Sequence, residues 1–229
     1  MNKRALRNTL AAAATVTALS QVAWADTNTF GVDPEAGNNT FSAVFDAALG
    51  ERIMAVSSTV GCTITADEGK LEGTAQCSVP LTSITVDSDD TKTEHFQQWA
   101  TNKKSDPQTC TFDLEVPNVQ LPSSLEEKKA VSFSTEGTFT ICGRQRDSRQ
   151  PEKIQGTVIL LPAGSLGNGK AYRIRAKIEG FDRELYGISP KSTAGWLARV
   201  QQLANVVATE GTIDVNIFAV SLNGTAEKQ

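Results

Sequence analysis

Apolar and polar side chains alternate along most of this chain. Between 170 and 181 (KAYRIRAKIEGF) nearly every second residue is apolar, and most of the residues between them are charged. Because successive side chains of a strand point to opposite faces, this pattern predicts an antiparallel strand with one apolar and one solvated face. Turn residues such as 67–69 (DEG) and 166–169 (LGNG) separate similar stretches, as in an antiparallel barrel or sandwich. The predicted strands are 41–48, 54–65, 70–86, 109–117, 130–142, 154–161, 170–180 and 212–222.

Two segments break the alternation and predict helices. Residues 91–104 form a short polar segment that includes Phe96 and Trp99. Residues 192–211 place apolar side chains three and four positions apart, which predicts an amphipathic helix lying on a sheet or over an opening. Its apolar positions are Trp196, Val200, Leu203 and Val207. Because no repeat or linker interrupts the chain, we expect one domain over 26–229.

The N-terminal segment 1–25 has the composition of a secretory signal peptide. Three basic residues precede a short, weakly apolar run, and Ala23-Trp24-Ala25 supplies a small-x-small cleavage site. We predict cleavage after Ala25 and a protein that is periplasmic or secreted. No other window is long and apolar enough to cross a bilayer, so we expect no integral membrane segment.

The charge balance narrows the class of partner. The formal net charge is −4, and removal of the three basic residues of 1–25 makes it −7. A net-negative domain is a poor partner for nucleic acid and for an anionic membrane surface, because both repel it.

Four cysteines in an exported protein predict two disulfides, for which three connectivities exist. Cys62 and Cys77 are nearly equidistant from the turn at 67–69 and share the phase of their apolar neighbours, so we expect them to pair. Cys110 and Cys142 would form the second bridge. Cys110 is predicted on the same strand face as its apolar neighbours, whereas Cys142 is predicted on the face opposite to its own apolar neighbours. This pairing would therefore need a bulge, for which Gly137 is the candidate.

The sequence offers little for catalysis or metal binding. His95 is the only histidine, so a histidine metal cluster cannot form. An enzyme that uses Asp33, His95 or Asp182 is the least supported hypothesis, because no pair of these residues can be argued into contact. We therefore expect a protein that is not an enzyme, with no metal site.

The order of motifs resembles the YceI-like family of exported lipid-binding proteins over nearly the whole mature chain. The segment 137–143 resembles the most distinctive motif of that family, Gly-x-Leu-Thr-Ile-x-Gly. The similar segments are 30–47 (FGVDPEAGNNTFSAVFDA), 79–96 (VPLTSITVDSDDTKTEHF), 106–119 (DPQTCTFDLEVPNV), 137–143 (GTFTICG) and 172–188 (YRIRAKIEGFDRELYGI). The resemblance implies an antiparallel lipocalin-like β-barrel of about eight strands with one or two short helices, whose hollow holds a long isoprenoid-type lipid, polyprenyl or quinone-like.

Alternation by itself does not distinguish a barrel that holds a ligand from one that its side chains fill. Small inward residues such as Gly73 and Ala75 favour a hollow. The alternative is a filled-core β protein that acts through its surface, as an interaction or stress-response module without a ligand. The sequence leaves open whether the protein forms a homodimer through an edge strand or through the 192–211 helix.

From strand phase, eight apolar residues are the candidates to line the hollow, and no cofactor is expected other than the bound lipid. The candidates are Phe96, Trp99, Phe112, Phe133, Phe139, Tyr172, Ile174 and Phe181.

Overall fold

The computed structural model describes residues 27–47, 50–102, 105–146, 150–167, 169–189 and 207–222. Strands dominate this part of the chain, together with one α-helix and short 3₁₀ turns. The strands are β1 (Thr27–Val32), β2 (Thr40–Ala47), β3 (Arg52–Ser57), β4 (Gly61–Asp67), β5 (Glu72–Pro80), β6 (Thr85–Val86), β7 (Thr111–Gln120), β8 (Ala130–Ile141), β9 (Glu152–Leu160), β10 (Ala171–Asp182) and β11 (Val207–Ser221). The helices are α1 (Asp90–Ala100), η2 (Leu81–Ser83), η3 (Pro107–Thr109) and η4 (Arg183–Tyr186).

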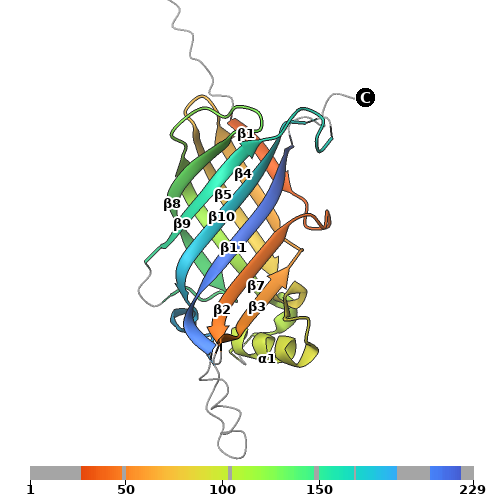
Figure 1. The fold of residues 1–229 in the computed structure, drawn as a ribbon, viewed down its shortest axis with the longest axis vertical. Coiled ribbons are helices and arrows are strands. Elements are labelled where there is room, and N and C mark those ends of the chain that lie inside the picture. Colours follow the sequence, from red (N-terminus) through yellow and green to blue (C-terminus); the bar gives the residue numbers. More distant parts are fainter. Residues whose placement is uncertain are drawn as a thin grey trace, which may run out of the picture.

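The strands form a closed antiparallel barrel (Figure 1). Its eight strands run in the order β1, β4, β5, β7, β8, β9, β10, β11, and β11 closes the circle by pairing with β1. One edge of β11 is shared, because β1 pairs near Ser221 whereas β2 pairs along 207–216. The strands β2, β3 and β6 extend the sheet from there toward α1. The predicted lipocalin-like barrel of about eight strands is confirmed.

The alternating pattern of 170–181 explains most of β10, and a bulge explains the rest. Tyr172 and Ile178 are buried on the inner face. Phe181 is out of phase with them, yet it is also buried, because the register with β11 shifts between Glu179 and Phe181. Gly180 lies in this bulge with φ +67°, a conformation that glycine adopts without steric cost.

Two strand predictions need correction, and one strand was not predicted. The predicted strand 54–65 is broken at 58–60, where the Ser57 hydroxyl accepts a hydrogen bond from the Thr59 amide and turns the chain. The predicted strand 70–86 ends at Pro80 and continues as η2 and β6. Residues 27–32, which the alternation did not predict as a separate strand, form β1 and close the barrel.

The predicted helix 192–211 is wrong over its last residues, which belong to β11. Val207 and Gly211 pair with Ala47 and Phe45 of β2. The buried guanidinium of Arg183 also donates hydrogen bonds to the carbonyls of Val207 and Ala208, at 3.0 and 3.1 Å, and so holds the extended start of this strand. The rest of that helix and the predicted signal peptide lie outside the described residues.

The other predicted helix is present as α1, at one end of the barrel that we call the base (Figure 1). The side chain of Asp89 caps it by accepting a hydrogen bond from the Lys92 amide at 2.8 Å. Its C-terminal end meets Arg144, whose guanidinium donates to the carbonyl of Ala100 and, at 3.1 Å, to that of Tyr186. A cation at this end also complements the helix dipole. Arg144 therefore joins α1, η4 and the end of β8.

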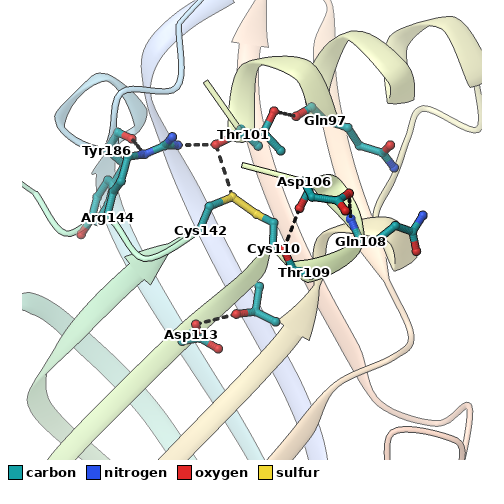
Figure 2. Close-up of a disulfide and its surroundings, with 12 residues drawn as sticks. Gln97, Thr101, Asp106, Gln108, Thr109, Cys110, Asp113, Cys142, Arg144 and Tyr186 are labelled. Carbon is teal, nitrogen blue, oxygen red and sulfur yellow. Dashed lines mark hydrogen bonds between the residues drawn. A yellow bond between two sulfur atoms is a disulfide. The ribbon is translucent and has the colours of Figure 1, made fainter. Parts of the chain in front are cut away.

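Both predicted disulfides are present. Cys62 and Cys77 lie directly opposite each other on β4 and β5, with Cα atoms 4.1 Å apart. Cys110 and Cys142 have Cα atoms 4.6 Å apart and lie just before β7 and just after β8 (Figure 2). The bulge expected at Gly137 is not needed, because Cys142 has left the strand and adopts φ +48°. This left-handed turn rotates the side chain toward Cys110.

Candidate ligand-binding cavity

The barrel encloses an apolar cavity of about 280 Å³. It begins at the end of the barrel away from α1, which we call the mouth, and reaches the aromatic side chains near the base. The mouth is formed by the β4–β5 turn, the start of the β7–β8 loop and the start of β10. Glu68 and Lys170, which line the cavity there, are partly exposed, so the cavity meets solvent at this end.

The cavity exists because several strands present small side chains where their inner faces meet. Ala66 and Gly73 form a cross-strand pair on β4 and β5, and Ala75 follows on the same face. Ala176 lines the wall formed by β10. The inward residues near them, such as Ile174, are only half-buried although they point away from solvent, because they border the cavity instead of packing against a partner.

Aromatic side chains close the cavity toward the base. Phe112 lies at the centre of this group, with ring centroids 6.0 to 6.2 Å from those of Phe41, Phe96 and Phe139. Phe139 continues the chain of contacts to Phe181 and Tyr186, at 5.3 and 5.8 Å. Edge-on contacts of this kind add about 0.5–1.5 kcal/mol per pair beyond the area they bury. The base is therefore a packed core, in contrast to the open upper half. We call these six residues the base aromatic cluster.

A buried carboxylate supports the base aromatic cluster. Glu152 accepts hydrogen bonds from the Tyr186 hydroxyl at 2.6 Å and from Arg146 at 3.2 Å. Burial raises the pKa of Tyr186, and the hydrogen bond to Glu152 raises it further, so the hydroxyl keeps its proton and remains a donor. This pairing satisfies a charge that would be costly to bury alone.

A polar cluster spans the mouth. Glu68, in the β4–β5 turn, lies 2.6 Å from the Lys170 ammonium and accepts a hydrogen bond from the Tyr172 hydroxyl at 2.7 Å. In the barrel order, β1 and β11 lie between β4 and β10, so these contacts reach over two strands. The ring of Tyr172 packs on Phe30 of β1, with centroids 4.8 Å apart. The cluster therefore links the β4–β5 turn to the start of β10 across the mouth.

The mouth cluster favours an ionised Glu68. Partial burial acts to raise the pKa of Glu68, but the hydrogen bonds from Lys170 and Tyr172 outweigh it, and the pKa lies below its ordinary 4.5. A carboxyl whose pKa is lowered on folding stabilises the fold above its unfolded pKa, and this contribution is lost as the pH falls through the folded pKa. The contacts of Glu68 with Lys170 and Tyr172 should therefore weaken only at acidic pH.

Removing the Tyr172 hydroxyl tests this account. In Tyr172→Phe the carboxylate loses one of its donors, so we expect the pKa of Glu68 to rise toward its ordinary value. An NMR titration of the side-chain carboxyl measures it. Tyr186→Phe removes an equivalent hydroxyl at the base and should leave the pKa of Glu68 unchanged. An unaltered Glu68 titration in Tyr172→Phe would show that the hydroxyl does not stabilise the charge.

Five of the eight residues expected to line the hollow border this cavity: Phe112, Phe133, Phe139, Tyr172 and Ile174. Phe96 and Phe181 belong instead to the base aromatic cluster. Trp99 stacks on His95 of α1, with ring centroids 6.4 Å apart, and does not line the cavity. That these residues contact a ligand stays a prediction.

Sequence reasoning missed Glu68 and Lys170 as part of the site. They are separated by 102 positions; Glu68 lies in a turn and Lys170 directly before β10, places where a charged residue is ordinarily solvated. Only the closure of the barrel brings them together. A local signal for Glu68 exists only in its place beside Asp67 and Gly69, which marks the turn.

The residues considered for catalysis serve local structure. Asp33 accepts a hydrogen bond from the Glu35 amide, and Asp182 accepts one from the Glu184 amide at the start of η4. His95 is exposed on α1. Within the described ranges, no group of three or more His, Cys, Asp or Glu side chains is placed to hold a metal ion. Nor does any described helix have the length and apolar character needed to cross a membrane.

Comparison with known proteins supports the fold. No family model matches the sequence, and no curated protein matches it. A solved structure of a polyisoprenoid binding domain from Saccharophagus degradans, implicated in plant cell wall breakdown, is similar with a TM-score of 0.56 and 14% sequence identity. The match covers 84% of this chain and 98% of that domain. At this identity the similarity establishes a shared fold and nothing more specific.

Proposed function

We propose that this protein binds an isoprenoid-type lipid, polyprenyl or quinone-like, with its apolar chain in the barrel cavity and its polar end at the mouth. The observation that carries the proposal is the enclosed apolar cavity with a polar cluster at its mouth. The shared fold with a polyisoprenoid binding domain adds support. Binding serves sequestration or transport and requires no catalytic group.

The energetics of such a complex are adequate. Burial of each methylene is worth about 0.8 kcal/mol. Three isoprene units, with about 15 carbons, therefore contribute about 12 kcal/mol. Where immobilising the ligand costs about 4 kcal/mol, the lower end of its range, about 8 kcal/mol remains, which corresponds to micromolar affinity. A longer chain would gain further affinity only if it reached past the base aromatic cluster.

We also propose that the protein acts outside the cytoplasm, as a periplasmic or secreted carrier without its first 25 residues. Two disulfides support this location, because such bonds persist in oxidising compartments and are rare in the cytosol. The basic and apolar composition of 1–25 supports it as well.

The alternative, a β protein with a filled core that acts through its surface, is less favoured. Its core would have to be filled throughout, as the base is. Instead the inward faces of β4, β5 and β10 present the small side chains Ala66, Gly73, Ala75 and Ala176 to the cavity.

Native mass spectrometry of the exported protein tests the proposal, with a cavity-filling variant as its probe. We expect the mass of a chain that begins at Asp26 plus one bound molecule, which organic extraction recovers as an isoprenoid lipid. We also expect the protein to take up added quinone or polyprenol. Ala75→Trp places a large ring in the cavity and should weaken the affinity for the added lipid at least a hundredfold. Gln76→Trp adds the same ring to the exposed face of β5 and should not.

Circular dichroism must show that both variants fold. A bare polypeptide mass with no uptake of either lipid would contradict the proposal and favour the surface module. Equal uptake by the two tryptophan variants would place the lipid outside the cavity.

A further inference from the structure

The charges that border the cavity gather at its mouth, and their balance is unusual for a site that holds a phosphate. Among the described residues that line the cavity, Lys170 is the only cation. Its ammonium lies 2.6 Å from Glu68, so its charge is already compensated. The anions that line the cavity are Asp67, Glu68 and Glu72. Asp67 in turn pairs with Lys70 of the same turn at 2.8 Å.

A phosphorylated lipid would meet this arrangement unfavourably. Phosphate sites in proteins supply charge-assisted hydrogen bonds from free Arg or Lys side chains. Here a phosphate would have to compete with Glu68 for Lys170, or lie beside carboxylates. Repulsion between like charges is stronger in a partly desolvated site than in water. The lowered pKa of Glu68 keeps this carboxylate ionised at neutral pH, so the repulsion persists there.

The same cluster has hydrogen-bonding capacity left for an uncharged group. The Lys170 ammonium has three N–H donors, and Glu68 accepts from one of them. The oxygen of Tyr172 donates its proton to Glu68 and keeps lone pairs that can accept. A hydroxyl can use both kinds of group, and a quinone carbonyl can accept from Lys170.

We propose that the mouth, through the Glu68–Lys170–Tyr172 cluster, selects lipids whose polar end is an uncharged hydroxyl or carbonyl and rejects lipids that end in a phosphate. Glu68 is the specificity-determining residue, because it neutralises Lys170 and presents its own negative charge. This inference rests on the proposed function and specifies the ligand class of the same cavity.

A headgroup series tests the inference. Dissociation constants at neutral pH are measured by native mass spectrometry for a polyprenol, a quinone and a polyprenyl phosphate that share one chain length. For the unaltered protein we expect the polyprenol and the quinone to bind at least tenfold more tightly than the phosphate. In Glu68→Gln, Lys170 loses its counter-charge, so the phosphate should gain at least threefold relative to the polyprenol.

Glu126→Gln is the matched control. Glu126 is an exposed carboxylate of the β7–β8 loop that pairs with Lys129 and does not line the cavity, so its removal should leave the ratio unchanged. Equal or tighter binding of the phosphate by the unaltered protein would overturn the headgroup selection while the proposed function stands. An unchanged ratio in Glu68→Gln would overturn the role of Glu68. Failure of all three lipids to bind would overturn the proposed function together with this inference.

Discussion

Replacement of Phe112 by alanine is expected to lower the free energy of unfolding by about 3–5 kcal/mol, the usual loss when a buried phenylalanine is truncated. Phe112 is only 5% exposed. It contacts Phe41, Phe96 and Phe139, so its removal breaks three aromatic contacts and leaves a void that the surrounding strands cannot close. Urea unfolding at equilibrium measures the loss.

The same substitution should change which lipids fit. Phe112 lies between the cavity and Phe96 of α1, so its truncation extends the hollow toward the base. We expect Phe112→Ala to gain affinity for polyprenols with longer chains relative to short ones, measured by native mass spectrometry with a series of chain lengths. A variant that is destabilised as expected but keeps the original length preference would show that Phe112 does not limit the cavity.

Phe218→Ala is the matched control for both measurements. Phe218 lies on the outer face of β11, where its ring packs under the guanidinium of Arg173, with the ring centroid 5.4 Å from Cζ. Both side chains are half-buried. The truncation should therefore cost about 1–2 kcal/mol, less than at Phe112, and should leave the length preference unchanged. An equal loss of stability in the two variants would contradict the special position of Phe112.

The architecture could be predicted from the sequence because alternation is a local property. Each strand from β7 to β10 lies within three residues of its expected bounds. The errors arose where a distant partner decides the conformation. The helical spacing of 192–211 extended to Val207, but pairing with Ala47 and the hydrogen bonds from Arg183 hold that residue in a strand. Tertiary contacts of this kind override a local preference.

The candidate site was predictable only in part, for the same reason. Strand phase placed Tyr172 and Ile174 on the cavity wall, because a regular strand preserves phase. Phe181 was expected on the same wall, but it belongs to the base aromatic cluster, where the bulge at Gly180 turns it inward, and this bulge has no clear signal in the pattern. The mouth cluster depends on barrel closure, which brings residues about a hundred positions apart into contact.

Loss of the disulfide between Cys110 and Cys142 is the second large effect that we expect. The bridge closes a loop of 32 residues, for which the chain-entropy model gives about 4 kcal/mol. The bridge between Cys62 and Cys77 closes 15 residues, for which the same model gives about 3 kcal/mol. Cys110→Ala/Cys142→Ala should therefore lose more stability in urea unfolding than Cys62→Ala/Cys77→Ala. Alanine is the better replacement at Cys110, because a serine hydroxyl would be buried there.

The two double variants should also differ in which part of the protein becomes more mobile. The sulfur of Cys142 lies 3.4 Å from the carbonyl oxygen of Ala100, a close contact without a proton, since a disulfide sulfur carries none (Figure 2). Arg144, two residues later, holds the same carbonyl. Without the bridge this turn is free to shift, so hydrogen exchange should accelerate in α1 while the mouth residues stay protected. Unchanged exchange in α1 would mean that Arg144 fixes the helix without help from the disulfide. Faster exchange there in the Cys62→Ala/Cys77→Ala variant would contradict the local role of the second bridge.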